Sequence, residues 1–317
     1  MPAIITHDFF GHDAIPAAAS ALGFGSEAES KAFILGNQGP DPLFYLLIDP
    51  FISSESRVGE LMHHARPTEL LAAISEAASA TVPSARGVAR AYAAGFVCHY
   101  LLDRTVHPFV YYWQRALCAA GIDGLDDSDG GNVHAEIERD LDEAVLFGRR
   151  GLTIAEYRPY EEILIAEDST LAIIDGVVFD AVLAAYGRVI DRRTFSHAVK
   201  SFRIMQRIFW SPTGKQRDLL GATERTLGGD RYSLVCAMSH RVRREGTSVF
   251  GNDEHATWAN PFTGEVRSDS FDDLYDRALS QVPEAFDVLL SGEIDREAVA
   301  RFTGGINFSG EPAYTEA

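Results

Sequence analysis

The chain has 317 residues, of which 46% are hydrophobic, and this is enough for one large domain or two small ones. Acidic residues outnumber basic ones by 46 to 28, and the resulting net charge of −18 repels DNA, RNA and anionic lipid at long range. A phosphate substrate is compatible with this charge, because bound dications reverse the local field. The three cysteines, Cys98, Cys118 and Cys236, include no CxxC pair and predict reduced thiols rather than a disulfide framework.

The N-terminal segment carries no basic stretch followed by a long apolar run, so we expect no secretory signal and a cytoplasmic location. No stretch reaches about 18 uninterrupted apolar residues, the length that a membrane-spanning helix needs. The most apolar long stretch, residues 171–190, is interrupted by Asp175, Asp180 and Arg188. This pattern predicts an amphipathic helix of a soluble protein without a transmembrane segment.

Helical patterns dominate the chain. Residues 68–80 are rich in Ala, Glu and Leu, and Pro67 before them suits a first helical turn. A long, mostly apolar stretch predicts a helix over residues 86–107. We expect Pro108 to end or kink this helix, because the residue before a proline avoids α geometry. Four later stretches predict further helices, over residues 134–147, 163–186, 195–209 and 271–290.

The segments between these helices show little strand-like alternation. Residues 121–131 form an acidic, glycine-rich stretch that fails the spacing of a calcium-binding loop and predicts a solvated loop. Residues 252–267 predict an irregular loop. Because no repeat or long linker divides the chain, we expect one all-α domain over residues 1–317, with its motifs in 1–150, a helical half at 151–303 and a loose tail at 304–317.

Three potential metal ligands, His99, Asp103 and His107, follow one another at four-residue spacing. At about 100° per residue they stay on one side of a helix, and their neighbours are mostly apolar, so this side is expected to be buried. A buried ionised carboxylate costs several kcal/mol unless it is paired or bound to metal. The pattern therefore predicts either a metal site or a core hydrogen-bond network in which Asp103 pairs with Arg104 or a histidine.

Further metal-type side chains lie elsewhere in the chain, namely His7, Asp41, the pair His63 and His64, and the helix-spaced pair His134 and Glu138. The two consecutive histidines point about 100° apart on a helix, so at most one of them faces a common site. With one carboxylate bridging, the set is large enough for two or three dications. Mixed histidine and carboxylate ligation without a thiolate favours Zn²⁺, with Mn²⁺ and Fe²⁺ as alternatives.

The order and spacing of these residues resemble the zinc-dependent phospholipase C family, whose all-α fold is shared with the S1/P1 nucleases. The matching motifs cover roughly residues 1–150 and are TH at 6–7, GPDP at 39–42, MHH at 62–64, GFVCHYLLDRTVHPF at 95–109 and HAEIE at 134–138. A later motif, NDEHATWANPFTGE at 252–265, is similar to one in unsecreted members.

The resemblance implies three metal ions. The first would be held by Asp41, His63, His99 and Asp103, the second by His7 with Asp103 as a bridge, and the third by His107, His134 and Glu138. The family position favours His63 over His64, because the ligand directly follows an apolar residue. Secreted members complete the second site with a new N-terminal tryptophan, and here Pro2, His12 or Asp13 would take its place.

The resemblance also implies an activity, the hydrolysis of phosphoric esters by metal-activated water, with Asp41 as the candidate general base. The expected substrates are small phosphoesters or phospholipid-like molecules. Two alternatives stay open: a nuclease of the S1/P1 type, which the scarcity of basic clusters disfavours, and a non-catalytic metalloprotein with structural ions. Trp258 and His255 are candidate substrate-binding residues, with core packing as the alternative for Trp258. The sequence leaves the oligomeric state open.

Overall fold

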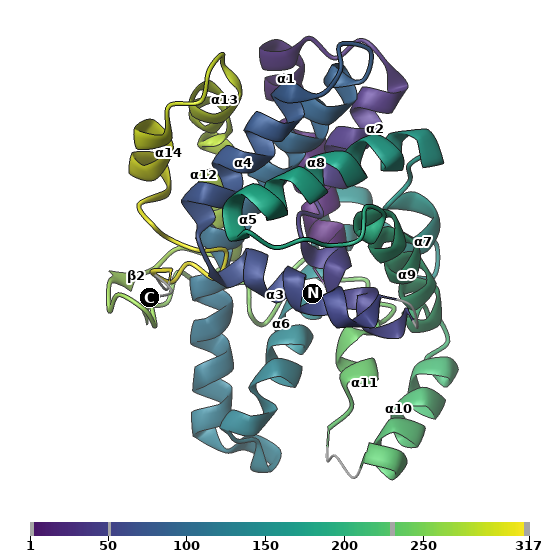
Figure 1. Cartoon of the computed structure of the whole chain (residues 1–317). Helices are drawn as coiled ribbons and strands as arrows, with labels where there is room; N and C mark the ends of the chain where they lie inside the picture. The colour runs from purple at the N-terminus through teal and green to yellow at the C-terminus, as the bar shows by residue number, and fades with distance from the viewer. Residues whose placement is uncertain (1–2, 50–51, 229–231, 314–317) are drawn as a thin grey trace. The chain divides into compact units, whose positions relative to one another are not determined.

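The computed structural model of the chain describes residues 3–49, 52–228 and 232–313. These residues are predominantly helical, which confirms the predicted all-α class (Figure 1). The elements are α1 Ile4–Leu22, α2 Glu27–Gly36, η1 Asp41–Ile48, η2 Ser53–Ser56, α3 Arg57–His64, α4 Pro67–Ala80, α5 Arg86–Ala120, η3 Ile122–Gly124, η4 Asp127–Asp129, α6 Gly130–Arg150, α7 Pro159–Glu162, α8 Asp168–Tyr186, α9 Thr194–Phe209, α10 Lys215–Gly228, α11 Leu234–Met238, β1 Trp258–Ala259, β2 Val266–Arg267, α12 Phe271–Ser280, α13 Val282–Leu290 and α14 Arg296–Thr303.

The described residues divide into two compact units, each assembled from stretches that are distant in sequence. As far as they are described, residues 7–105, 164–203 and 275–317 form the larger unit, and residues 1–6, 106–163 and 204–274 form the smaller unit. Helix α5 continues through the boundary between Thr105 and Val106. That the chain forms a single domain stays a prediction.

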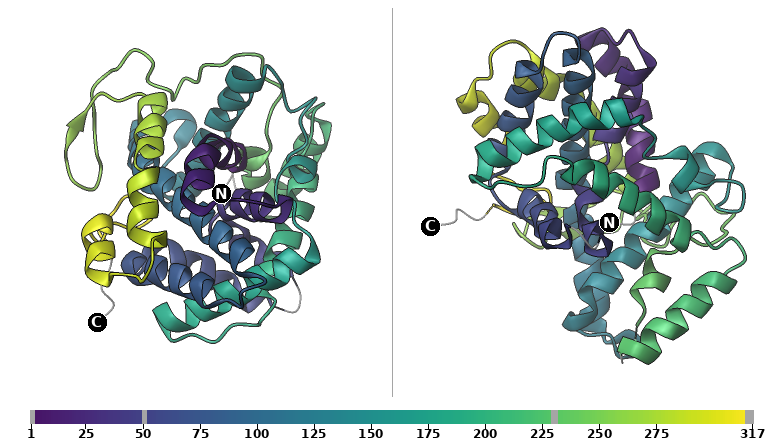
Figure 2. Two further views of the ribbon diagram at one scale, coloured as in Figure 1. Left: turned by 90° about the horizontal axis from the view of Figure 1, so that it is seen from above. Right: turned by 45° about the vertical axis from the view of Figure 1, so that its right-hand side comes forward.

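The core of the larger unit surrounds the first part of α5. Helix α4 packs along α8 and also contacts α13 and α14 (Figures 1 and 2). The apolar residues of α5 in this unit are buried, among them Tyr92, Phe96 and Tyr100. The ring of Phe308, near the end of the described chain, lies 6.0 Å from that of Phe96 and 5.0 Å from that of Tyr100. This packing fixes the segment of α5 that carries His99 and Asp103.

Two glycines allow α2 and α5 to approach closely. A methyl group at Gly36 would lie 2.3 Å from the carbonyl oxygen of Tyr92, and one at Gly95 would lie 2.0 Å from the carbonyl oxygen of Phe33. No larger residue fits at either position without moving a backbone. The contact brings the end of α2 next to His99, one turn further along α5.

Helix α8 is, among the described helices, the one that is long and apolar enough to cross a bilayer by length and composition. Its most apolar 18-residue window is 50% buried within the chain. Asp175 of this helix also accepts hydrogen bonds from the backbone N and the Oγ of Ser196. A core helix passes the same composition test, so α8 is no clear transmembrane segment.

In the smaller unit, α6 packs against α11, which in turn packs against α10. The first turn of α1 is held by the buried carboxylate of Asp142 in α6, which accepts hydrogen bonds from the backbone N of Ile5 and Thr6 at 3.1 and 2.8 Å. His240 Nε2 lies 3.0 Å from the same carboxylate. These contacts satisfy backbone donors that a helix start leaves free.

Two of the predicted helix boundaries are wrong. Pro108 lies inside α5 and does not end it, although a proline there removes one backbone hydrogen bond. The residues beside it, Phe109 and Val110, are buried, and their packing offsets this loss. The predicted helix over residues 271–290 is divided into α12 and α13, because Pro283 lies in the first turn of α13 and begins a new helix.

Two predicted irregular segments are more ordered than expected. Within residues 252–267, β1 and β2 pair antiparallel, with Trp258 opposite Arg267. The described part of the predicted loose tail, residues 304–313, is anchored: Phe308 is buried and its backbone N donates to the carbonyl oxygen of His63 at 3.2 Å. The apolar side chain of Phe308 accounts for this anchoring, and residues 314–317 lie outside the described chain.

Candidate metal centre

Five of the eight predicted ligands meet in the larger unit, in what we call the five-residue cluster. They come from four separate elements: His7 from α1, Asp41 from η1, His63 from α3, and His99 and Asp103 from α5. Each is at most 4% exposed. Buried imidazoles and carboxylates at this density require partners for their charges and lone pairs. Within the described residues, the buried His7 Nδ1 and His99 Nε2 have no hydrogen-bond partner.

Each carboxylate of the five-residue cluster lies between two imidazoles. Asp103 Oδ1 is 3.1 Å from His7 Nε2, and Asp103 Oδ2 is 3.1 Å from His99 Nε2. Asp41 Oδ1 is 2.9 Å from His63 Nε2 and 3.8 Å from His99 Nε2. The ligand atoms of His7, Asp41 and His99 lie within 4.8 Å of one another, and so do those of His63, His99 and Asp103. These groups are close enough to hold a metal ion.

Backbone carbonyls set the tautomers of two of these histidines. His63 Nδ1 lies 2.7 Å from the carbonyl oxygen of Gly59, and His99 Nδ1 lies 3.0 Å from that of Asn37. A carbonyl oxygen only accepts hydrogen bonds, so each Nδ1 carries the proton, and in the neutral ring Nε2 then presents its lone pair. Both lone pairs face carboxylate oxygens, which are acceptors too. Such a contact is favourable only with a cation, either a proton or a metal ion, between the two acceptors.

The electrostatics of the cluster keep Asp41 ionised. Burial raises the pKa of the Asp41 carboxyl, but the surrounding cationic groups, His99 and His63 among them, together lower this pKa below its usual value. Burial likewise opposes the charged form of His99, while Asp103 and Asp41 raise its pKa overall. The ionised carboxylate is the form that a metal ligand needs.

The GPDP motif at residues 39–42 has a local structural reason. Gly39 has a left-handed φ of +50°, and a methyl group there would lie 2.2 Å from His99 Cδ2. Glycine therefore serves two purposes, the turn itself and the close approach of the loop to the His99 ring. The 3₁₀-helix η1 begins immediately afterwards with Asp41, which is thereby held against the imidazoles.

The other three predicted ligands meet in the smaller unit. His107 Nε2 and His134 Nε2 lie 3.1 and 3.2 Å from the same oxygen, Glu138 Oε1. His134 Nδ1 lies 3.0 Å from Gln114 Oε1, which again leaves Nε2 for a ligand. Burial opposes the charge of Glu138, yet the two imidazoles hold its pKa well below the ordinary range. Glu138 Oε2 is buried and has no hydrogen-bond partner among the described residues. This His/His/Glu group also suits a metal ion.

The remaining candidate ligands lie outside these groups. His64 lines a separate cavity with Arg57 and Arg188, so His63 is the histidine of the pair that joins the cluster. His12 is 45% exposed and lies 3.6 Å from Asp8. Asp13 accepts a hydrogen bond from the Tyr275 hydroxyl at 2.8 Å. Pro2, the third candidate for the second ion, lies outside the described residues.

The two predicted substrate-binding residues lie in the smaller unit. Trp258 is 3% exposed, its ring packs 5.1 Å from that of Phe109, and its Nε1 donates to the carbonyl oxygen of Asp269 at 3.0 Å. His255 is exposed and lies 3.3 Å from Asp273. Trp258 therefore has a packing role in the hairpin, and substrate contact by either residue stays a prediction.

Several residues that shape the centre carry no ligand-type signal in the sequence. Asn37 and Gly59 contribute only backbone carbonyls, which every residue has. Gln114 is an ordinary helix residue that becomes meaningful only through its contact with His134. Gln114 lies in α5 and His134 in α6, twenty residues further along the chain. Helical periodicity does not extend across the segment between the two helices, so it could not predict this contact.

Comparison of the chain with protein-family models, with curated proteins and with solved structures found no match. A function can therefore be proposed only from the donor atoms of these residues and their geometry. Imidazole nitrogens and carboxylate oxygens suit Zn²⁺, Mn²⁺ and Fe²⁺, and the described residues place no thiolate within either group.

Proposed function

We propose that the protein is a metal-dependent phosphoric-ester hydrolase of the zinc-dependent phospholipase C type. The observation that supports this most is the arrangement of His63 and His99, which are fixed through Nδ1 and direct Nε2 toward Asp41 and Asp103. In a hydrogen-bonded core each of these contacts needs an added proton, whereas in a metal centre the same nitrogen and oxygen atoms are the ligands of the dications.

The residues are divided among the ions according to their contacts. One ion would be held by Asp41, His63, His99 and Asp103, a second by His7 together with Asp103, and a third by His107, His134 and Glu138. The two oxygens of Asp103 face different histidines, as a bridging carboxylate requires. Zn²⁺ is the expected metal, with Mn²⁺ and Fe²⁺ as alternatives. Bound ions of this kind supply Lewis-acid activation of a phosphoester and of water.

The chain's own residues would assist in two ways. Asp41 is ionised and buried, and it would act as the general base that accepts a proton from the attacking water. Asp103 would keep its negative charge throughout and hold the cations beside it in place. The carbonyls of Asn37 and Gly59 would fix the imidazole orientations, so that little rearrangement accompanies the reaction.

The charge of the chain favours small phosphoesters or phospholipid-like molecules over nucleic acid as substrates. A net charge of −18 works against binding of a polyanion, whereas it matters less for a single phosphodiester at a cationic centre. The nuclease alternative is tested beside the first proposal by including a single-stranded oligonucleotide among the substrates.

The experiment compares hydrolysis of bis-p-nitrophenyl phosphate, p-nitrophenylphosphorylcholine and a single-stranded oligonucleotide by three proteins. These are the unmodified chain, Asp41→Asn, and the exposed control Asp253→Asn. We expect the unmodified chain and the control to hydrolyse at least one phosphodiester, and Asp41→Asn to lose about 100-fold or more in rate. Metal-loaded protein that hydrolyses none of the three would instead indicate structural ions, and equal activity of both variants would contradict the role of Asp41.

A further inference from the structure

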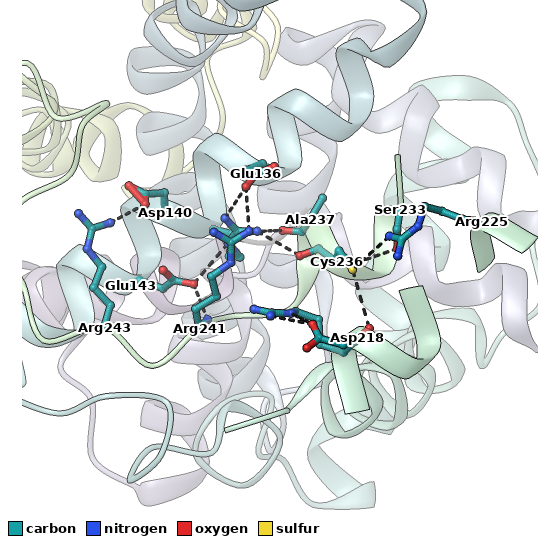
Figure 3. A network of polar contacts seen from close by, with 12 residues as sticks. Glu136, Asp140, Glu143, Asp218, Arg225, Ser233, Cys236, Ala237, Arg241 and Arg243 are labelled. Atoms are coloured by element: carbon teal, nitrogen blue, oxygen red, sulfur yellow. Dashed lines mark hydrogen bonds and ion pairs between the residues drawn. The ribbon is translucent and has the colours of Figure 1, made fainter. Parts of the chain in front are cut away.

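A cavity of about 450 Å³ lies within the smaller unit, lined by residues of α5, α6, α10 and α11 and of the segments that follow α5 and α11. We propose that it binds a small organic anion with an apolar body, at a site separate from the candidate metal centre. The size falls within the range of pockets that hold small ligands, roughly 300–1,000 Å³. Figure 3 shows the polar contacts on its wall.

One part of the cavity wall is apolar. Leu117, Leu125, Val133, Ile137 and Phe250 all line it. The ring of Phe250 is held by Trp113, whose ring centroid lies 5.7 Å away. Such a surface gains free energy by contact with an apolar group rather than with water. The ligand therefore carries a hydrocarbon or aromatic body.

The carboxylates of the cavity wall are already paired with arginines. Glu136 Oε1 lies 2.9 Å from Arg139 Nη2 and 3.1 Å from Arg241 Nη2. Asp140 is paired with Arg243 (Figure 3). It also accepts a hydrogen bond from the Ser248 hydroxyl at 2.7 Å. These acids are consequently neutralised by cations of the protein itself. They offer little attraction to a cationic ligand.

The arginines of the wall exceed its acids. Arg139, Arg225 and Arg241 line the cavity against Glu136 and Asp140, although the chain as a whole is strongly acidic. Arg139 is buried and its Nη1 donates to the carbonyl oxygen of Cys236 at 3.0 Å, which fixes α11 against α6. Arg225 contacts only Cys236 Sγ, at 3.9 Å, among the interactions of the described residues. Its charge is thus available to a ligand.

The cavity and the metal ligands use different faces of α6. At about 100° per residue, His134 and Glu138 point nearly opposite to Glu136, Arg139 and Asp140. His134 and Glu138 join His107 in the His/His/Glu group, whereas the other three residues line the cavity. A ligand of the cavity therefore does not occupy the His/His/Glu group.

Together these features select the ligand. The apolar wall binds the hydrocarbon or aromatic part of the ligand. The half-exposed Arg241 and the exposed Arg225 bind its single anionic group, such as a carboxylate, sulfonate or phosphate monoester. A polyanion is disfavoured by the net charge of −18 of the whole chain. The head group can belong to a fatty acid or to an alkyl phosphate, and the test separates the two.

Fluorescence titration with 8-anilinonaphthalene-1-sulfonate, an aromatic anion, tests the proposal on the full-length protein with its metal. We expect saturable binding of one molecule, displaced by decanoate or by decyl phosphate but not by the neutral decanol at equal concentration. Whichever anion displaces at the lower concentration identifies the preferred head group. Displacement by decanol as effective as by both anions would contradict a role for the arginines, and absence of saturable binding would contradict the site.

Paired variants locate the binding in the cavity. Arg225→Gln with Arg241→Gln is expected to weaken anion binding about tenfold, which corresponds to roughly one charge-assisted contact. The control, Arg193→Gln with Lys215→Gln, removes the same charge from exposed positions outside the cavity and is expected to bind as the unmodified chain does. Equal weakening in both pairs would overturn the proposal.

A third variant keeps the test independent of the arginine network. Val249 lies at the cavity wall and is 75% exposed, so Val249→Trp adds bulk at the mouth without crowding the core. We expect it to weaken binding of the sulfonate probe at unchanged thermal stability. Unchanged binding in this variant would place the probe elsewhere on the protein and contradict the proposal.

Discussion

At the scale of single residues, the candidate metal centre depends on which nitrogen of each histidine is free. The sequence predicts His99 and Asp103 as ligands because they share a helix face by spacing alone, and that they bind metal stays a prediction. It does not predict the carbonyl oxygens of Asn37 and Gly59 that fix the tautomers, because backbone acceptors have no side-chain signature. His63 and His64 are the same residue type, so their chemistry does not distinguish them as ligands. The structure distinguishes them by position, because His63 joins the five-residue cluster and His64 lines a separate cavity.

The proposed bridging role of Asp103 is tested by Asp103→Asn, which keeps the shape of the side chain but removes its charge. We expect the five-residue cluster to lose its ions while the His/His/Glu group keeps one, so metal content falls from about three to about one per chain. Elemental analysis after desalting measures this, with Asp253→Asn as the exposed control. Full metal content in Asp103→Asn would show that the carboxylate does not bridge.

The orientation of His134 depends on the side chain of Gln114. Replacing it in Gln114→Leu removes the partner of Nδ1, and we expect metal affinity of the His/His/Glu group to fall about 10- to 100-fold. Gln114→Glu retains an acceptor and should restore most of the affinity. Competition with a chromophoric chelator measures both variants. If Gln114→Leu and Gln114→Glu weaken metal binding equally, the hydrogen bond to His134 Nδ1 does not contribute to metal affinity.

At the scale of elements, close packing decides what local sequence rules leave open. The rule for the residue before a proline predicted that the helix ends or kinks at Pro108, yet α5 continues past it, and its neighbours Phe109 and Val110 are buried. Likewise, the glycine content at residues 304–310 predicted a loose tail, whereas Phe308 fills a space between aromatic rings of α5. Long-range contacts of this kind are absent from any short window of sequence.

The crossing of α2 and α5 is tested by Gly95→Ala. The added methyl group meets the carbonyl oxygen of Phe33 at 2.0 Å, so we expect the free energy of unfolding to fall by about 2–3 kcal/mol. The matched control is Gly176→Ala in α8, where a methyl group meets nothing within 4 Å. Because alanine favours helix, the control should gain about 0.5–1 kcal/mol. Urea unfolding measures both, and equal stability of the two variants would refute the close contact.

At the scale of the whole molecule, the sequence correctly predicts a helical chain, and the structure adds its division into two units. The five-residue cluster lies in the larger unit and the His/His/Glu group in the smaller one. Sequence order could not reveal this division, because both units combine N-terminal, central and late stretches. Because the chain has a net charge of −18, binding of an anionic substrate would depend on the proposed cations.

Metal binding is expected to link the stability of the molecule to pH. Imidazole Nε2 binds a cation only when unprotonated, and because Asp103 and Asp41 raise the pKa of His99, protons begin to displace the metal above the ordinary histidine pKa of about 6.5. Binding to the folded state alone stabilises it, and this contribution is present near pH 7.5 and lost toward pH 5. Thermal unfolding of metal-loaded and chelator-treated protein should therefore differ at pH 7.5 and converge at pH 5. An equal difference at both pH values would contradict the linkage.

The presence of metal is the claim on which the proposed function rests, and elemental analysis of protein purified without chelator tests it most directly. Three groups of ligands predict about three equivalents of transition metal per chain, mainly zinc. About two equivalents would mean that the site of His7 is incomplete. Protein that carries no metal, and binds none when zinc is added back, would contradict the account.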